Sequence, residues 1–228
     1  LVREGAEVWH GRGGQGWPSW TFSNHDAPRA ISRWAQGRDP KAYAEMAMLL
    51  LMCLRGNVFI YYGEELGLPQ ADVPFERLTD PEAITNWPQT LGRDGARTPM
   101  PWQADRPQAG FSAVEPWLPL DPRHAVLAVD RQEADPTSML HSTRRLVAFR
   151  KSQPALVSGD MAMLDAGPGL LSFERTQGNQ RLICVFNLGH TAADWSLPDG
   201  WRVIEAVNLN APPEGQLPPM AGLVMATA

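Results

Sequence analysis

The chain has 228 residues and a mass of 25.2 kDa, enough for one or two domains with a sizeable core. Apolar residues make up 43% and charged residues 20% of the chain, which excludes a disordered or fibrous protein. The net charge of -5 favours neither nucleic-acid binding nor a polybasic membrane anchor. The longest apolar run, residues 46–54, is too short to span a membrane, so we expect neither nucleic acid nor a membrane as a partner.

The two cysteines, Cys53 and Cys184, each lie inside an apolar run and are far apart in the sequence. We expect buried, reduced thiols. No Cys/His spacing in the chain is typical of a zinc site, so we predict no metal. The chain begins at Leu1 with neither an initiator methionine nor a signal-peptide pattern. We expect it to be a piece of a longer, cytoplasmic protein.

The first predicted elements are an irregular loop and a strand. Residues 1–16 are rich in glycine, which predicts an irregular entry loop. Residues 17–23 are aromatic and β-prone, which predicts a buried strand. This strand ends in the polar tripeptide Asn-His-Asp at residues 24–26.

A helix and a second strand follow. Asp39 and Pro40 are typical of an N-cap and a first helical residue. Apolar residues recur at helical spacing over residues 41–55, so a helix with Gly56 as its C-cap is predicted. Residues 57–62 form a continuous apolar run, as in a parallel strand buried on both faces. Strand, loop, helix and strand make a βαβ unit, in which functional groups gather at the C-terminal ends of the strands.

The next stretch, residues 68–137, is long, rich in proline and low in periodicity, which favours a functional loop. A second amphipathic helix is predicted over residues 138–152 and ends at Pro154. Beyond it, short β-prone runs alternate with turns. We therefore predict two domains, residues 1–154 and an antiparallel β-sandwich over residues 155–228. Five strands are predicted in the second domain, at residues 169–175, 181–188, 192–197, 201–208 and 222–226.

Ionisable groups at the predicted strand ends are the candidates for chemistry. Asp26 beside His25 can act as a base, a nucleophile or an electrostatic partner for a cation, or can simply cap a loop. Glu64 and Glu65 would suggest glycoside hydrolysis if they lie near Asp26, but capping a helix or pairing with an arginine is the simpler interpretation. Arg97 can hold a carboxylate or donate to sugar hydroxyls in a fixed fork, or it can form a surface salt bridge.

Three segments together resemble the α-amylase family of glycoside hydrolases, in its α-glucosidase and oligo-1,6-glucosidase branch. Residues 22–26 (Phe-Ser-Asn-His-Asp) are similar to the family's strand-seven motif. Residues 57–67 are similar to strand eight and its following loop, and residues 92–102 to the Arg-Asp-x-x-Arg-Thr-Pro-Met-Gln-Trp segment of α-glucosidases. Pro101 departs from that segment, which commonly has Gln at this position. The segments occur in the family's order, and the resemblance covers nearly the whole chain, including the closing barrel helix and the C-terminal β domain.

The resemblance implies an α/β plus all-β fold, in which the C-terminal part of a (β/α)₈ TIM barrel precedes a small antiparallel β domain. Residues 1–154 would supply strands 7 and 8, the long loop and the closing helix of the barrel. The family's nucleophile, an Asp after strand four, and its general acid/base, a Glu after strand five, match no segment of this chain. The smaller domain inserted after strand three is also missing. We therefore expect the chain alone to be inactive.

The resemblance also implies roles for individual residues. Asp26 matches the family's third essential carboxylate, a catalytic group that holds sugar hydroxyls and stabilises the positively charged transition state. His25 matches a histidine that binds hydroxyls in the same subsite, and Arg97 matches an arginine of the pocket for the non-reducing sugar. Three further positions match residues that support the site without touching the sugar: Asn24, Glu64 and Glu65.

The leading hypothesis is that the chain is the C-terminal portion of a retaining α-glucosidase, a glycosidase that hydrolyses terminal α-linked glucose from short oligosaccharides. The alternatives are a transglycosylating or isomerising relative, similar to amylosucrase or sucrose isomerase, and a non-catalytic sugar-binding or interaction module. The expected partners are an oligosaccharide or disaccharide substrate and the N-terminal part of the same enzyme, because the two strands would otherwise expose apolar edges. The family uses no organic cofactor and usually holds calcium outside this region, so no cofactor is expected.

Overall fold

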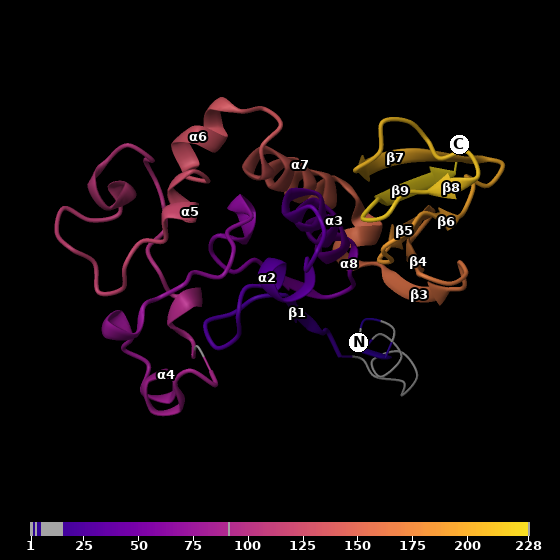
Figure 1. Cartoon of the computed structure of the whole chain (residues 1–228). Coiled ribbons are helices and arrows are strands. Elements are labelled where there is room, and N and C mark those ends of the chain that lie inside the picture. Colours follow the sequence, from indigo (N-terminus) through magenta and orange to yellow (C-terminus); the bar gives the residue numbers. More distant parts are fainter. Residues whose placement is uncertain (1, 3, 6–15, 91, 228) are drawn as a thin grey trace. The chain divides into compact units, whose positions relative to one another are not determined.

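The computed structural model describes residues 2, 4–5, 16–90 and 92–227 (Figure 1). Its internal contacts divide the chain into two compact units. Unit 1 comprises the described residues of Leu1–Trp20, Glu45–Phe59 and Arg145–Ala228, and unit 2 comprises those of Thr21–Ala44 and Ile60–Arg144. The predicted boundary between residues 154 and 155 falls inside unit 1. The two units therefore differ from the two predicted domains, whose limits stay a prediction.

The C-terminal part of unit 1 is an antiparallel sheet of five strands in the order β3-β4-β5-β9-β7 (Figure 1). A second antiparallel sheet joins β6 to β8. Gly178 has a positive φ of 56° in the two-residue turn between β4 and β5, as its Gly-Asn sequence predicts. The strands are β3 Asp160–Leu164, β4 Leu170–Gln177, β5 Gln180–Asn187, β6 Ala193–Asp194, β7 Trp201–Val207, β8 Gln216–Leu217 and β9 Gly222–Thr227.

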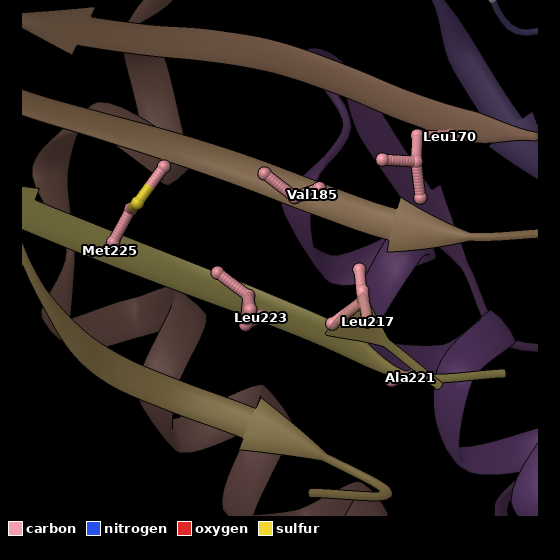
Figure 2. Close-up of a cluster of buried hydrophobic side chains, with 6 residues drawn as sticks. All are labelled: Leu170, Val185, Leu217, Ala221, Leu223 and Met225. Atoms are coloured by element: carbon pink, nitrogen blue, oxygen red, sulfur yellow. The ribbon is translucent and has the colours of Figure 1, made fainter. Parts of the chain in front are cut away.

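The two sheets of this region share one hydrophobic core. Figure 2 shows its six buried side chains, which come from β4, β5, β8 and β9 and from the residue just before β9. Ala193 of β6 and Trp201 of β7 pack against the same cluster. The sequence predicts β4, β5, β7 and β9 correctly to within two residues at each end. The buried side chains are Leu170, Val185, Leu217, Ala221, Leu223 and Met225.

The strand predicted over residues 192–197 is wrong beyond the two residues of β6. Its partner β8 is followed by Pro218 and Pro219, which have no N–H group to continue the ladder. Strand β3 was not predicted, because its sequence Asp-Met-Ala-Met-Leu has few β-branched or aromatic residues.

The two strands predicted to be buried are short and largely exposed. β1 (Ser19–Thr21) and β2 (Asn57–Phe59) form a two-stranded sheet, so the predicted extents of residues 17–23 and 57–62 are too long. Phe59 is 56% exposed. Within the described residues this sheet has no third strand to cover its edges. The prediction that both strands are buried is therefore wrong. The prediction that they expose apolar edges is confirmed.

The first long helix, α3 (Pro40–Cys53), begins as predicted. The Asp39 carboxylate accepts a hydrogen bond of 2.7 Å from the backbone N–H of Ala42, which makes it an N-cap. The helix ends two residues earlier than predicted, and Gly56 does not cap it directly. Instead, Arg150 donates to the carbonyls of Met52 and Leu54. Met52 lies in the last turn of α3 and Leu54 directly follows it, where carbonyls have no partner within the helix.

A second arginine, Arg175, completes the end of α3. It is fully buried and donates four hydrogen bonds to backbone carbonyls, one of them to Cys53 at 2.5 Å. Burial lowers the pKa of its guanidinium to about 10. Cys53 and Cys184 are free and buried, as predicted.

The long stretch in unit 2 is not a featureless loop. It contains short helices, which the weak periodicity of residues 68–137 does not reveal. Proline at the first helical position and a preceding Asp cap both α4 and α5. The second long helix, α7, confirms the prediction over residues 138–152. From Ala30 onward, the described residues outside α3 form the α-helices α2 Ala30–Trp34, α4 Pro81–Asn86, α5 Pro122–Ala125, α6 Val129–Ala134, α7 Met139–Ser152 and α8 Pro154–Ser158, and the 3₁₀ turns Glu64–Leu66, Phe75–Arg77, Asp94–Ala96 and Pro107–Gly110.

Small hydrophobic clusters hold the short helices of unit 2 together. One contains Leu66, Leu68, Met100 and Leu140, and Tyr62 packs against it. A second cluster consists of Val73, Leu78, Ala83 and Leu118. Among the described residues, no helix combines the length and hydropathy that a bilayer crossing requires.

Candidate active site

The Asn-His-Asp segment forms a tight turn after β1. The Asn24 side-chain oxygen accepts a hydrogen bond of 2.8 Å from the backbone N–H of Asp26, and Asn24 bridges to Ala27. This Asx-type turn fixes the backbone on both sides of His25. The side chains of His25 and Asp26 are more than half exposed. Asn24 therefore lies where it orients the segment that presents both predicted site residues.

The structure brings the three principal candidates together within unit 2. Arg97 Nη2 lies 3.0 Å from Asp26 Oδ1, although 71 residues separate the two. Arg97 Nε donates to the backbone carbonyl of His25 at 2.8 Å. His25 Nε2 lies 3.2 Å from Asp26 Oδ2. Each oxygen of the Asp26 carboxylate therefore has a nitrogen partner, and the side chain is held in one orientation.

A second arginine faces the same carboxylate. Arg93 Nη1 lies 3.5 Å from Asp26 Oδ1, on the oxygen that Arg97 also contacts. The sequence interpretation assigned no role to Arg93. A signal was present, because Arg93 and Arg97 are four residues apart and flank the 3₁₀ turn Asp94–Ala96. Two arginines at the ends of one turn can point in the same direction.

Arg93 is anchored by a buried carboxylate. Asp80 accepts from Arg93 Nε at 2.9 Å and from Arg93 Nη2 at 2.7 Å, and its side chain is 0% exposed. Asp80 also accepts from the backbone N–H of Arg93 and from that of Glu82, which makes it the N-cap of α4. These hydrogen bonds hold the pKa of Asp80 well below its usual range despite the cost of burial.

The two glutamates lie in the 3₁₀ turn Glu64–Leu66 that follows Tyr62 and Gly63. Glu64 accepts from Ser23 Oγ at 2.6 Å and from the backbone N–H of Tyr61 at 2.8 Å. Burial raises the pKa of Glu64 and that of Glu65. Glu64 thus connects Ser23 to Tyr61 and holds two segments together that are far apart in the sequence.

A buried arginine supports the backbone next to Arg97. Arg29 is 1% exposed, lies over the rings of Tyr61 and Tyr62, and donates to the carbonyl of Ala96 at 3.3 Å. The Tyr61 hydroxyl donates to the same carbonyl at 3.0 Å, and the Tyr62 hydroxyl donates to the Thr98 carbonyl at 2.7 Å. Burial lowers the pKa of Arg29 and raises that of Tyr62 to about 12. The carbonyls of the residues before and after Arg97 are therefore both held by side-chain donors, which limits the positions that Arg97 can take.

Within the described residues, the Asp26 site is not part of a metal-binding cluster. In the described part of the chain, no group of three or more His, Cys, Asp or Glu side chains is placed to hold a metal ion. A cavity of about 760 Å³ lies elsewhere in unit 2, and residues such as Ile31, Arg38 and Met139 line it. Its lining includes none of the three principal candidates. The Asp26 carboxylate is 56% exposed, and the arginines that face it are partly exposed.

Known proteins are similar to this chain in sequence. The family model described as alpha amylase, catalytic domain, matches residues 5–159. The chain is 46% identical over 198 residues to a probable alpha-glucosidase of Rhizobium meliloti (strain 1021), with 86% of this chain and 36% of that protein covered. It is 34% identical over 208 residues to an oligo-1,6-glucosidase of Parageobacillus thermoglucosidasius, with 82% and 36% covered. The chain thus spans 36% of the length of these relatives.

Solved structures extend the comparison to the whole chain. The crystal structure of an alpha-glucosyl transfer enzyme has a TM-score of 0.92 and 40% sequence identity, and the match covers 100% of this chain and 43% of that chain. The trehalulose synthase of Pseudomonas mesoacidophila MX-45 has a TM-score of 0.85 at 24% identity, with 100% and 45% covered. The second likeness concerns the fold alone.

Proposed function

Because the chain belongs to the α-amylase family, we propose that it is the part of a retaining α-glucosidase that binds the terminal glucose of a short oligosaccharide. The observation that carries the proposal is the contact of Arg97 with both Asp26 and the His25 carbonyl, because it builds one polar surface from two distant segments. The relatives named alpha-glucosidase and oligo-1,6-glucosidase support the substrate class.

The proposed chemistry follows from the charge of Asp26. An ionised carboxylate accepts hydrogen bonds from sugar hydroxyls and lies close to the ring that gains positive charge as the glycosidic bond breaks. Arg97 fixes the carboxylate in advance, so little reorganisation is needed in the transition state. His25 adds a ring N–H or lone pair for a neighbouring hydroxyl. None of these groups needs to form a bond to the sugar.

Bond breaking itself is proposed to use groups outside this chain. Retaining glycosidases need a carboxylate nucleophile and a carboxylic acid, and the chain has no segment similar to either family motif. The partner that would supply them is the remaining part of the same enzyme. We accordingly propose that the isolated chain binds sugar weakly and does not turn it over.

The test compares the complete enzyme with the isolated chain on 4-nitrophenyl α-glucoside. The complete enzyme is expected to release nitrophenol, and Asp26→Asn is expected to lower its kcat/KM by roughly 10²–10³-fold because a charge that stabilises the transition state is lost. Asp199→Asn, an exposed carboxylate in a turn of the C-terminal region, is the matched control and should leave the rate unchanged. The proposal would be contradicted if the isolated chain hydrolysed the glucoside and Asp26→Asn abolished this activity.

A second candidate function is transfer of the glucosyl group to another sugar. The observation that favours it is the TM-score of 0.92 to an alpha-glucosyl transfer enzyme. The same binding residues serve both reactions, since they differ in whether water or a hydroxyl attacks the covalent intermediate. Product analysis with maltose at high concentration separates them. Hydrolysis gives glucose alone, whereas transfer gives oligosaccharides longer than the substrate.

A further inference from the structure

We infer that Arg93, held by the buried carboxylate of Asp80, is a positioning residue for Asp26. This inference rests on the proposed function, since Asp26 must act on a sugar for its position to matter. It adds a functional pair, Asp80 and Arg93, to the three principal candidates. The pair acts through Asp26, and neither member has to touch the substrate.

The geometry divides the Arg93 guanidinium between two carboxylates. Nε and Nη2 form the fork that binds Asp80, at 2.9 Å and 2.7 Å. The remaining nitrogen, Nη1, lies 3.5 Å from Asp26 Oδ1. A planar guanidinium whose fork is fixed has no freedom to turn its third nitrogen away. Asp80 therefore determines where Arg93 meets Asp26.

The loop around Arg93 is built to keep this position. Asp94, the next residue, is fully buried and accepts from the backbone N–H groups of Thr79 and Asp80 at 2.7 and 2.9 Å. The segments that carry Asp80 and Arg93 are thus joined twice, once by each aspartate. Together these links hold the backbone of Arg93 next to that of Asp80.

Two arginines on one oxygen leave the other oxygen of Asp26 for substrate. Oδ1 faces both Arg93 and Arg97, whereas Oδ2 faces His25, which is more than half exposed. A sugar hydroxyl can approach Oδ2 by displacing His25 or by sharing it. The arginine pair fixes the plane of the carboxylate and so the direction in which Oδ2 accepts.

The main test is Arg93→Lys in the complete enzyme, assayed with 4-nitrophenyl α-glucoside. A lysine can keep the charge pair with Asp80, but its single nitrogen cannot bind Asp80 as a fork and reach Asp26 as well. We expect kcat to fall roughly tenfold to a hundredfold with KM changed less than threefold, because the lost interaction acts on the transition state. The midpoint of urea unfolding should change little.

The chain offers a matched control in Asp121 and Arg123. Asp121 is also buried, also caps a short helix, and also accepts from Nε and Nη2 of its arginine, at 3.0 and 2.6 Å. Arg123 contacts Asp72 and the Gln70 carbonyl and has no contact with Asp26. Arg123→Lys should therefore disturb the fold as much as Arg93→Lys does and leave kcat unchanged.

A second comparison tests the inference even if the single variants fail to fold. The neutral pairs Asp80→Asn with Arg93→Gln and Asp121→Asn with Arg123→Gln remove both charges of each pair without leaving one buried alone. Loss of kcat in the first pair only supports the inference. Equal kcat in both, or losses that follow unfolding midpoints, overturn it. A wild-type complete enzyme that leaves the glucoside intact overturns the proposed function, and with it the premise of this inference.

Discussion

At the scale of single residues, the absence of a side chain at Gly92 allows the backbone before Arg93 to approach Asp80. Gly92 immediately precedes Arg93 and has a φ of 61°. A Cβ atom there would lie 2.5 Å from the Ala83 Cβ and 2.7 Å from Asp80 Oδ2. Only glycine combines this backbone with so close an approach to the carboxylate that anchors Arg93.

We predict that Gly92→Ala lowers the free energy of unfolding by about 2–4 kcal/mol, because backbone strain and steric overlap add. Gly178→Ala is the matched control. Gly178 has a φ of 56° with no atom within 4 Å of a built Cβ, so strain alone should cost about 1 kcal/mol. Urea unfolding measures both. Equal losses would show that the contacts with Ala83 and Asp80 relax freely.

A buried histidine gives a pH-dependent stability. His124 is fully buried, its Nε2 lies 2.8 Å from the Pro69 carbonyl, and burial lowers its pKa below the usual 6.5. Below about pH 6.5, His124 takes up a proton in the unfolded chain but stays neutral in the folded chain. The free energy of unfolding therefore falls as the pH decreases.

The free energy of unfolding should therefore decrease between pH 7.5 and 5.5 more in the wild type than in His124→Gln. Taking the difference between the two proteins removes the contributions of other groups, such as Glu64, whose raised pKa has the opposite effect. His141→Gln, on the surface of α7, serves as the control. An identical pH dependence in wild type and His124→Gln would contradict the assignment.

At the scale of elements, the end of α3 is closed by side chains from distant parts of the sequence. Arg150 reaches the carbonyls of Met52 and Leu54, and also that of Gly56 at 2.9 Å. Burial lowers the pKa of Arg150, yet its charge still lies at the negative end of the helix dipole. The arginine replaces the glycine cap that the sequence suggests.

We predict that Arg150→Met, which keeps most of the apolar stem, destabilises the chain by about 2–4 kcal/mol because several buried carbonyls lose their donor. Arg144→Met on the same helix removes only an exposed pair with Glu133 and should cost less than about 1 kcal/mol. Chemical denaturation with circular dichroism detection would distinguish the two variants. Similar midpoints for both would mean that water replaces Arg150 at the helix end.

Helices and strands are predicted well from the sequence where the hydrophobic periodicity is strong. Contacts are predicted poorly where the two partners are far apart in the sequence. Both long helices and four strands of the C-terminal sheet are predicted from local patterns. The role of Arg93 is not predicted from the sequence, because its partner Asp80 lies 13 residues earlier in a stretch without periodicity. The same holds for Arg150, whose partner Met52 is 98 residues away. Asp26 and Arg97 are found from sequence because recognisable motifs carry them.

At the scale of the whole molecule, the exposed β1–β2 sheet predicts association. Phe59 and Trp17 are large, exposed apolar side chains on this part of unit 1, and the sheet has two unpaired edges within the described residues. Native mass spectrometry should find the isolated chain self-associated or bound to the remaining part of the enzyme. Phe59→Lys should reduce self-association, whereas Phe111→Lys, in a loop of unit 2, should not. A monomer unaffected by either change would contradict this expectation.

The division of unit 1 along the sequence also has a consequence in time. The buried half of α3 lies in the segment Glu45–Phe59, whereas the last and longest segment of its unit begins only at Arg145. At about 5–20 residues per second, a ribosome needs roughly ten seconds or more to synthesise the C-terminal sheet after α3 has emerged. During that interval the part of unit 1 from Arg145 onward is not yet available to cover residues 46–54, so this helix is where a chaperone should bind the nascent chain.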